Sequence, residues 1–169
     1  MEYILKHLAI AITGPSNSGK TTLIEKISNK LSNKFNIAII KHDPSNKAKF
    51  DVNGKDSDRF FKSGANVAVI SDERTTIFKH ETSSLEKLVE YLMPFDLLIV
   101  EGLKTWNLPR IGVFRGEIED SYIPYLQAVA IDSTIPSNQV AKLNVEVLDL
   151  NNTDEIIEYI WKNAKLIKG

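Results

Sequence analysis

Short apolar runs alternate with segments of helical periodicity along the chain. Strands are predicted at residues 7–13, 36–42, 66–72, 75–80, 96–102, 110–114, 127–132 and 145–150. Helices are predicted at 20–34, at 56–65, from a capping box at Ser83 and Glu86 through the sequence LEKLVEYLM, and at 152–167. Strands that alternate with helices favour an α/β fold with a mostly parallel sheet and helices on both faces.

The segment between the first strand and the first helix has the pattern G-x-x-x-x-G-K-[ST], from Gly14 to Thr21. In this context the backbone N–H groups of such a loop surround phosphate groups. We expect Lys20 to reach the terminal phosphates and the Thr21 hydroxyl to bind Mg²⁺. The predicted nucleotide-binding residues here are Gly14, Pro15, Ser16, Asn17, Ser18, Gly19, Lys20, Thr21 and Thr22. The alternative is a turn that only starts a helix.

Polar residues follow several predicted strands, and ligands of parallel sheets bind beyond the carboxyl ends of the strands. These residues are Thr13-Gly14, Lys41-His42-Asp43, Ser71-Asp72, Glu101-Gly102 and Asp132-Ser133.

A magnesium site needs a carboxylate from a neighbouring strand, and the strand 96–102 offers two. Five steps of about 3.3 Å place Asp96 roughly 16 Å from Glu101, at the amino end of the strand. Glu101 is therefore the predicted metal ligand.

The polar segment after the second strand offers further candidates. Asp51 is predicted to hold magnesium through a water or to orient a water. His42 is a candidate ligand contact, with a purely structural role as the alternative. Lys55 and Asp56 fit a loop and a helix cap equally well.

The sequence gives fewer indications of base recognition and of hydrolysis than of phosphate binding. Asp132 follows a late strand, where a carboxylate could accept hydrogen bonds from guanine, although the chain has no Asn-Lys-x-Asp motif. No arginine finger with a water-positioning glutamine is evident, so any hydrolysis is expected to be slow.

The length, net charge and composition of the chain limit the classes of partner and of site that are expected. A length of 169 residues suits a single domain spanning 1–169. A net charge of −1 gives no reason to expect nucleic acid or an anionic membrane as a partner. The absence of cysteine excludes disulfides and zinc–thiolate sites. No apolar run approaches the roughly 20 residues of a membrane span, and the apolar start is interpreted as a strand, so a cytoplasmic location is expected.

The quoted pieces resemble the molybdopterin-guanine dinucleotide biosynthesis protein B (MobB) family. They are GPSNSGKTTL, IIKHD, FDVNGKDSDRFFKSGA, DLLIVEGLK, RIGVFR and AVAID, in the family's order over most of the chain. The resemblance implies a three-layer P-loop NTPase fold, GTP and Mg²⁺ as ligands, and a homodimer. It also implies a partner guanylyltransferase (MobA) that attaches GMP to molybdopterin, and it adds Lys104 beside Glu101 to the site. Many members of the family have extra histidines after the KH pair, whereas this chain continues as HDPSNKAKFD.

Three hypotheses follow from the sequence. The first is a GTP-binding accessory protein of molybdenum cofactor biosynthesis that is at most a slow GTPase. The second is a small-molecule kinase or ligase related to dethiobiotin synthetase, in which Lys41, Asp43 or Lys104 positions an acceptor. The third is a scaffold whose loop only binds anions.

Overall fold

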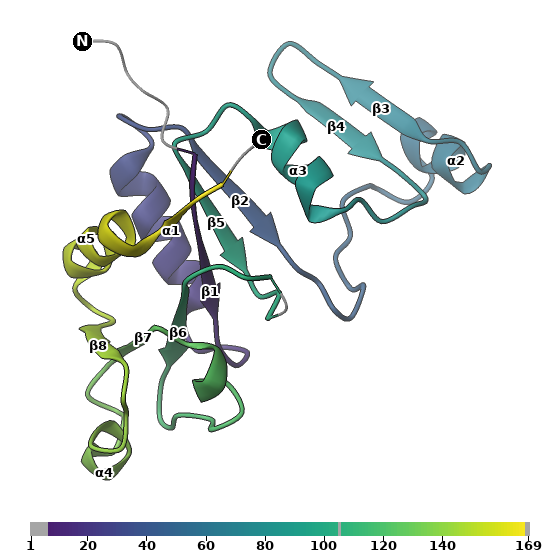
Figure 1. Ribbon diagram of the computed structural model, residues 1–169. Helices are drawn as coiled ribbons and strands as arrows, with labels where there is room; N and C mark the ends of the chain where they lie inside the picture. Colours follow the sequence, from purple (N-terminus) through teal and green to yellow (C-terminus); the bar gives the residue numbers. More distant parts are fainter. Residues whose placement is uncertain (1–6, 105, 168–169) are drawn as a thin grey trace. The chain divides into compact units, whose positions relative to one another are not determined.

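The apolar runs form one central sheet in the computed structural model, which describes residues 7–104 and 106–167 (Figure 1). Its strands are β1 (Leu8–Thr13), β2 (Ile37–Lys41), β5 (Leu97–Glu101), β6 (Arg110–Phe114), β7 (Ala128–Ile131), β8 (Glu146–Asp149) and β9 (Lys165–Leu166). The order is β2-β5-β1-β6-β7-β8, and β9 pairs with β1. All pairs are parallel except β1 with β9. The fold class predicted from the sequence is therefore confirmed.

The central strands are apolar throughout because both of their faces are covered. Residues 9–12 of β1 and residues 97–100 of β5 have no exposed surface. A strand of a parallel sheet that is buried on both faces lacks the polar alternation of a half-exposed strand. This explains why uninterrupted apolar runs mark β1 and β5 in the sequence.

Helices α1 (Lys20–Leu31) and α5 (Thr153–Asn163) share one core with one face of the sheet. The buried side chains of the two helices are Leu23, Ile24, Ile27, Leu31, Ile156, Tyr159 and Ile160. The Asn152 side chain accepts a hydrogen bond from the Glu155 N–H at 3.3 Å and caps α5. The helix predicted at 152–167 ends at Asn163, because the chain then turns to add β9 to the sheet.

A second core is formed by the side chains of β6 and β7 that do not belong to the first core. It contains Phe114, Ile118, Leu126, Val129, Ile131 and Ile135. The 3₁₀ helix η1 (Ile123–Tyr125) and the short helix α4 (Ser137–Val140) belong to segments that contribute to this core. Neither element was predicted, because each is too short to show a hydrophobic period.

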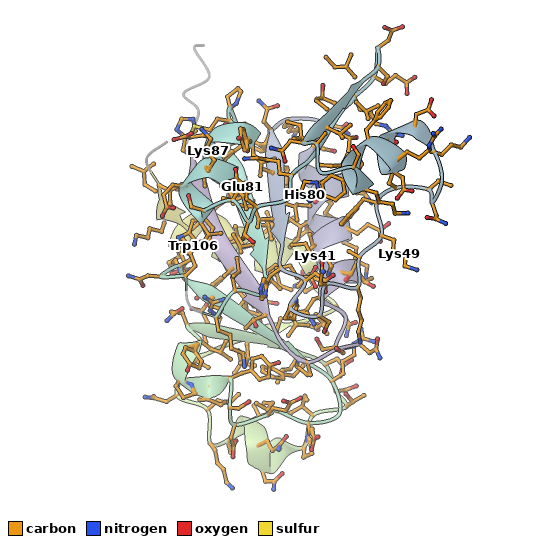
Figure 2. All side chains as sticks on the ribbon, turned by 90° about the vertical axis from the view of Figure 1, so that its right-hand side faces the viewer. Lys41, Lys49, His80, Glu81, Lys87 and Trp106 are labelled. Carbon is orange, nitrogen blue, oxygen red and sulfur yellow. The ribbon has the colours of Figure 1, made fainter. Side chains whose placement is uncertain are left out.

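Residues 43–89 form a separate compact unit, here called unit 2, and the rest of the chain forms unit 1. Unit 2 contains α2 (Asp56–Lys62) and an antiparallel hairpin of β3 (Val67–Ile70) and β4 (Thr75–Phe78). Its His80 ring, labelled in Figure 2, stacks on Phe61 with centroids 3.9 Å apart. The single domain expected for residues 1–169 stays a prediction, since every strand of the central sheet belongs to unit 1.

Two local predictions are wrong. Ser71 and Asp72 do not follow a strand of the central sheet; they belong to the turn of the β3–β4 hairpin, in which the Ser71 N–H donates to Arg74 O at 2.9 Å. Helix α3 (Leu85–Leu92) begins after Ser84, whose hydroxyl accepts from the Lys87 N–H at 3.3 Å. Ser84 therefore takes the capping role expected of Ser83.

Across the described ranges, no helix is both long enough and apolar enough to cross a membrane.

Gly112 in the middle of β6 has no room for a side chain. An added Cβ would lie 2.5 Å from Leu126 Cδ1 and 2.6 Å from Phe114 Cε2, and both neighbours are buried. We expect Gly112→Ala to lower the free energy of unfolding by about 1–3 kcal/mol, as overpacking does. Urea unfolding measures this. Adding Leu126→Ala should recover part of the Gly112→Ala loss, and strictly additive losses would contradict the packing.

Candidate nucleotide-binding site

The loop between β1 and α1 is shaped by its two glycines. Gly14 has a φ of 145°, and a Cβ there would lie 2.3 Å from the carbonyl oxygen of Val113 in β6. Gly19 has a φ of 99° and is the N-cap of α1. The Leu23 N–H donates to Gly19 O at 2.9 Å, so the amides of the three residues from Lys20 to Thr22 precede the first bond within the helix. Such an end of a helix attracts anions.

Lys20 lies across this loop. Its ammonium donates to Pro15 O at 2.6 Å. Burial lowers the pKa of Lys20; the Glu101 carboxylate opposes this shift and the Lys41 ammonium adds to it. The Ser18 hydroxyl, also in the loop, is buried and has no hydrogen-bond partner. A phosphate oxygen is the type of acceptor that would satisfy both groups.

Glu101 stands where the sequence places it, at the carboxyl end of β5 and in register with Ile12 of β1 and Lys41 of β2. Its side chain is only 12% exposed and its Oε2 accepts from Lys41 Nζ at 2.8 Å. Lys41, labelled in Figure 2, is 60% exposed. Asp96 lies at the other end of the strand, where its Oδ2 accepts from the Asn36 N–H at 2.9 Å. The choice between the two carboxylates therefore agrees with the strand's direction.

The predicted metal ligands do not form one cluster of acidic residues. In the described part of the chain, no group of three or more His, Cys, Asp or Glu residues could hold a metal ion. Asp51 belongs to unit 2, where its Oδ1 accepts from the Val52 N–H at 2.8 Å and its Oδ2 is buried without a partner. Thr21 is exposed at the start of α1. A magnesium ion held by Thr21 and Glu101 would take its other ligands from phosphate and water.

His42 follows β2 and packs beside Gly102. Its N–H donates to Glu101 O at 3.0 Å. A Cβ on Gly102, which has a φ of 87°, would lie 3.3 Å from the His42 Cβ. His42 is thus held at the sheet edge that carries Glu101.

Arg110 was predicted only as a strand residue, yet it organises the segment that carries Lys104. Its guanidinium is buried and donates to four carbonyl oxygens: Gly102 at 2.9 Å, Leu103 at 3.0 Å, Lys104 at 3.4 Å and Trp106 at 2.8 Å. Burial lowers the pKa of Arg110. The Lys104 ammonium lies 3.5 Å from the centroid of the Tyr122 ring, a cation–π contact. The sequence signal for this structural role of Arg110 was a single arginine at the start of an otherwise apolar strand.

Arg115 and Asp132 form an ion pair past the ends of β6 and β7. Arg115 Nε lies 3.3 Å from Asp132 Oδ2. The Thr134 N–H donates to Asp132 Oδ1 at 3.0 Å, and the Thr134 hydroxyl donates to the same oxygen. These Thr134 bonds, helped by the Arg115 charge, lower the pKa of Asp132. The sequence indicated Asp132 but not Arg115.

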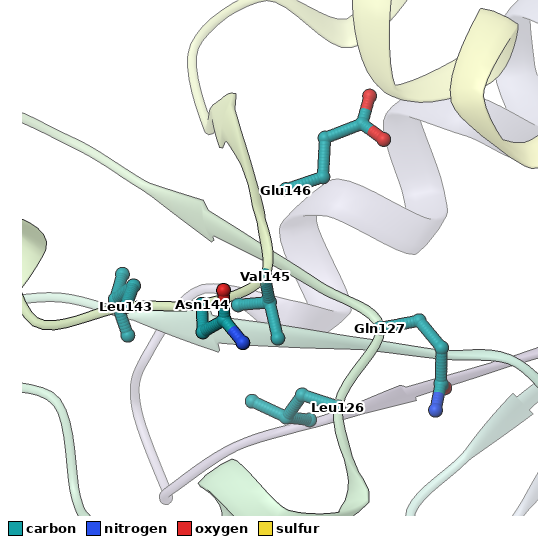
Figure 3. Close-up of a pocket in the computed structure, with 6 residues that line it drawn as sticks. All are labelled: Leu126, Gln127, Leu143, Asn144, Val145 and Glu146. Atoms are coloured by element: carbon teal, nitrogen blue, oxygen red, sulfur yellow. The ribbon is translucent and has the colours of Figure 1, made fainter.

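The pocket in Figure 3 belongs to the opposite end of the strands. It has a volume of about 620 Å³ and is lined by Leu126, Gln127, Leu143, Asn144, Val145 and Glu146. Gln127 immediately precedes β7 and Glu146 begins β8, so the pocket lies at the amino ends of these strands. It is therefore separate from the loop at the carboxyl ends.

A glycine-shaped loop between the first strand and helix of a parallel sheet, with a lysine across it and a carboxylate beside it, defines a P-loop nucleotide-binding protein. Residues 9–135 match the family described as Molybdopterin guanine dinucleotide synthesis protein B (MobB). The chain belongs to the MobB family.

Two named relatives agree with this assignment. The chain is 29% identical over 157 residues to the "Molybdopterin-guanine dinucleotide biosynthesis adapter protein" of Haemophilus influenzae, covering 89% of this chain and 86% of the relative. It is 32% identical over 132 residues to the "Probable molybdopterin-guanine dinucleotide biosynthesis adapter protein" of Bacillus subtilis, covering 75% and 74% of the two chains.

Solved structures share the fold. A crystal structure of molybdopterin-guanine biosynthesis protein B matches with a TM-score of 0.68 at 23% identity, covering 92% of this chain and 99% of the other. A crystal structure of Bacillus subtilis MobB also gives 0.68 at 23% identity, covering 90% and 98%.

Substitution of Arg110 tests whether its hydrogen bonds stabilise the segment that carries Lys104. Arg110→Leu leaves several carbonyls without their donor, and we expect a loss of about 3 kcal/mol in the free energy of unfolding. Arg110→Lys should also be destabilised, since one ammonium cannot match the planar fork of donors. Thermal and urea unfolding measure both variants. A leucine variant as stable as the wild type would show that these hydrogen bonds contribute nothing.

Proposed function

We propose that this protein binds GTP with Mg²⁺ in the P-loop and acts as an adapter in the attachment of GMP to molybdopterin. The partner is a molybdopterin guanylyltransferase of the MobA kind. The relatives' names supply the pathway. The observation that carries the nucleotide part is the position of Lys20, whose ammonium crosses the loop to Pro15 O at 2.6 Å, at the sheet edge where β5 ends in Glu101.

The roles of individual residues are part of this proposal. Residues 14–22 and Lys104 bind the nucleotide, and Thr21, Glu101 and Asp51 serve the metal. The place of Asp51 in this set comes from the sequence alone, because Asp51 belongs to unit 2. Asp132 belongs to the nucleotide side of the site, and its contacts are taken further below.

The proposed turnover is slow, below about 1 s⁻¹, the low end of ordinary enzymes. The carboxylate beside the loop, Glu101, is ion-paired with Lys41 and is assigned to the metal. It therefore does not serve as the base for an attacking water. Such a site suits binding and presentation of GTP better than its rapid consumption.

We also propose a homodimer in the cytoplasm, where GTP is available. Large apolar side chains of unit 2 are exposed in the single chain, namely Phe50 (82%), Ile70 (80%), Phe60 (58%) and Ile77 (56%). Exposed apolar groups of this kind support contact with another protein.

Lys20→Ala removes the ammonium that neutralises the terminal phosphates. We expect GTP affinity to fall at least about tenfold, equivalent to about 1.4 kcal/mol, with an unchanged fold. Calorimetry measures the affinity. In a mixture of purified guanylyltransferase, molybdopterin and limiting GTP, the wild-type protein should raise the dinucleotide yield and Lys20→Ala should not.

Lys30→Ala is the matched control, since it removes a lysine of the same helix that pairs with Asp154 instead. No increase in yield with the wild-type protein at any GTP concentration would refute the adapter function. Rapid phosphorylation of a small acceptor would favour a kinase instead.

Glu101→Gln should weaken the Mg²⁺ dependence of GTP binding, because the amide keeps the shape of the carboxylate but cannot neutralise the cation. A titration of GTP affinity against Mg²⁺ concentration measures this. Glu25→Gln, an exposed change on α1, is the control. An identical Mg²⁺ dependence in Glu101→Gln and wild type would remove Glu101 from the metal site.

A further inference from the structure

The strand order gives the phosphate loop two different sides. β1, which leads into the loop, lies between β5 and β6. Glu101 and Lys41 occupy the side of β5 and β2, whereas Arg115 and Asp132 occupy the side of β6 and β7. The proposed function assigns Glu101 to the metal and leaves Arg115 without a role.

Arg115 lies directly against the loop. The position of a Cβ on Gly19 is 3.5 Å from Arg115 Nε, 3.8 Å from Cζ and 3.9 Å from Nη2. Gly19 precedes Lys20 and caps α1, so the guanidinium is beside the end of the helix where phosphates bind. The Arg115 side chain is 51% exposed, and within the described residues no hydrogen bond of its two terminal nitrogens is observed. These nitrogens remain as donors for an anion.

Both carboxylate oxygens of Asp132 already interact with neighbouring residues of unit 1. Its Oδ1 accepts both the N–H and the hydroxyl of Thr134, and its Oδ2 faces Arg115 Nε. Reading guanine would require both oxygens to accept from the N1–H and N2–H groups of one base. The existing bonds instead suit a carboxylate that holds a guanidinium in place.

The side of the loop also indicates which phosphate is concerned. Glu101, the metal ligand of the proposed function, ends β5 in register with Ile12 of β1, and β5 and β6 lie on opposite sides of β1. The proposed function therefore places the terminal phosphate and the metal on the β5 side. On that arrangement, Arg115 would be nearest the part of the nucleotide closer to the nucleoside.

We propose that Arg115 is a nucleotide-binding residue that contacts the phosphate nearest the nucleoside, and that Asp132 positions Arg115 instead of reading the base. This inference rests on the proposed function, since it concerns the same nucleotide. The contact is common to GTP and GDP, whereas the contacts of Lys20 and Glu101 favour the triphosphate.

The test measures GTP and GDP affinity with Mg²⁺ by calorimetry for wild type, Arg115→Ala and Arg115→Lys, at several salt concentrations. We expect Arg115→Ala to weaken both nucleotides by the same factor, about tenfold or more, as for loss of a charge-assisted hydrogen bond. Its affinity should also depend less on salt. Arg115→Lys, which keeps the charge, should recover part of the loss. Lys30→Ala, the loss of another surface ion-pair cation on unit 1, should match wild type.

The outcomes separate the possible failures. A wild-type protein that binds neither nucleotide overturns the proposed function together with this inference. Wild-type affinity in Arg115→Ala overturns the inference alone, and a loss confined to GTP overturns the assignment to the inner phosphate. Equal losses in Arg115→Ala and Arg115→Lys, with matching drops in the melting temperature of the free protein, would show a structural role instead.

Asp132→Asn tests the positioning role. We expect it to change GTP and ATP affinity by the same factor, so that the preference between the bases is kept. A preference that disappears in Asp132→Asn and survives in Arg115→Ala would show that Asp132 reads the base, and would overturn the second half of the proposal.

Discussion

The register of β1 between β5 and β6 determines which side chains can reach the phosphate loop. Ile12 pairs with Glu101, whereas Thr13 pairs with Gly112, so β6 continues past the end of β1. This overhang brings the Val113 carbonyl against Gly14 and Arg115 against Gly19. On the other side, β5 ends one residue before the end of β1 and leaves Glu101 at the edge. β5 therefore places the Glu101 carboxylate beside the loop, and the residue that follows β6, Arg115, places its guanidinium along the loop.

The same register explains the buried Arg110. Gly102 N–H donates to Ile12 O at 3.0 Å and Ala11 N–H donates to Pro109 O at 2.8 Å, so the β5–β6 connection leaves and returns beside β1. A segment that crosses a buried strand cannot pair its carbonyls within a ladder, and buried carbonyls need donors. Arg110 supplies them from the first position of β6. The conformation of the segment carrying Lys104 thus depends on a buried guanidinium that donates to the carbonyls of that segment.

Local sequence signals were sufficient for the strands other than β9, for the long helices and for the loop, because each has its own period or motif. The direction of β5 was enough to choose Glu101 over Asp96. The hairpin in unit 2 was not recognised as a separate sheet, because the runs VAVI and TTIF resemble strands of either kind. Arg115 was missed for another reason: its contact with Gly19 depends on how far β6 is shifted against β1, and register between distant strands leaves no mark in one sequence.

Both cations that flank Lys20 already have carboxylate partners, Lys41 with Glu101 and Arg115 with Asp132. The loop is therefore closer to neutral before a nucleotide arrives than its basic residues suggest. In the proposed function, magnesium binding by Glu101 would break the pair with Lys41 and leave its ammonium available to a phosphate. Metal and nucleotide binding on that side would then be coupled. On the Arg115 side the carboxylate stays in place, since Thr134 holds it, and the guanidinium can contact a phosphate through its terminal nitrogens without breaking the pair.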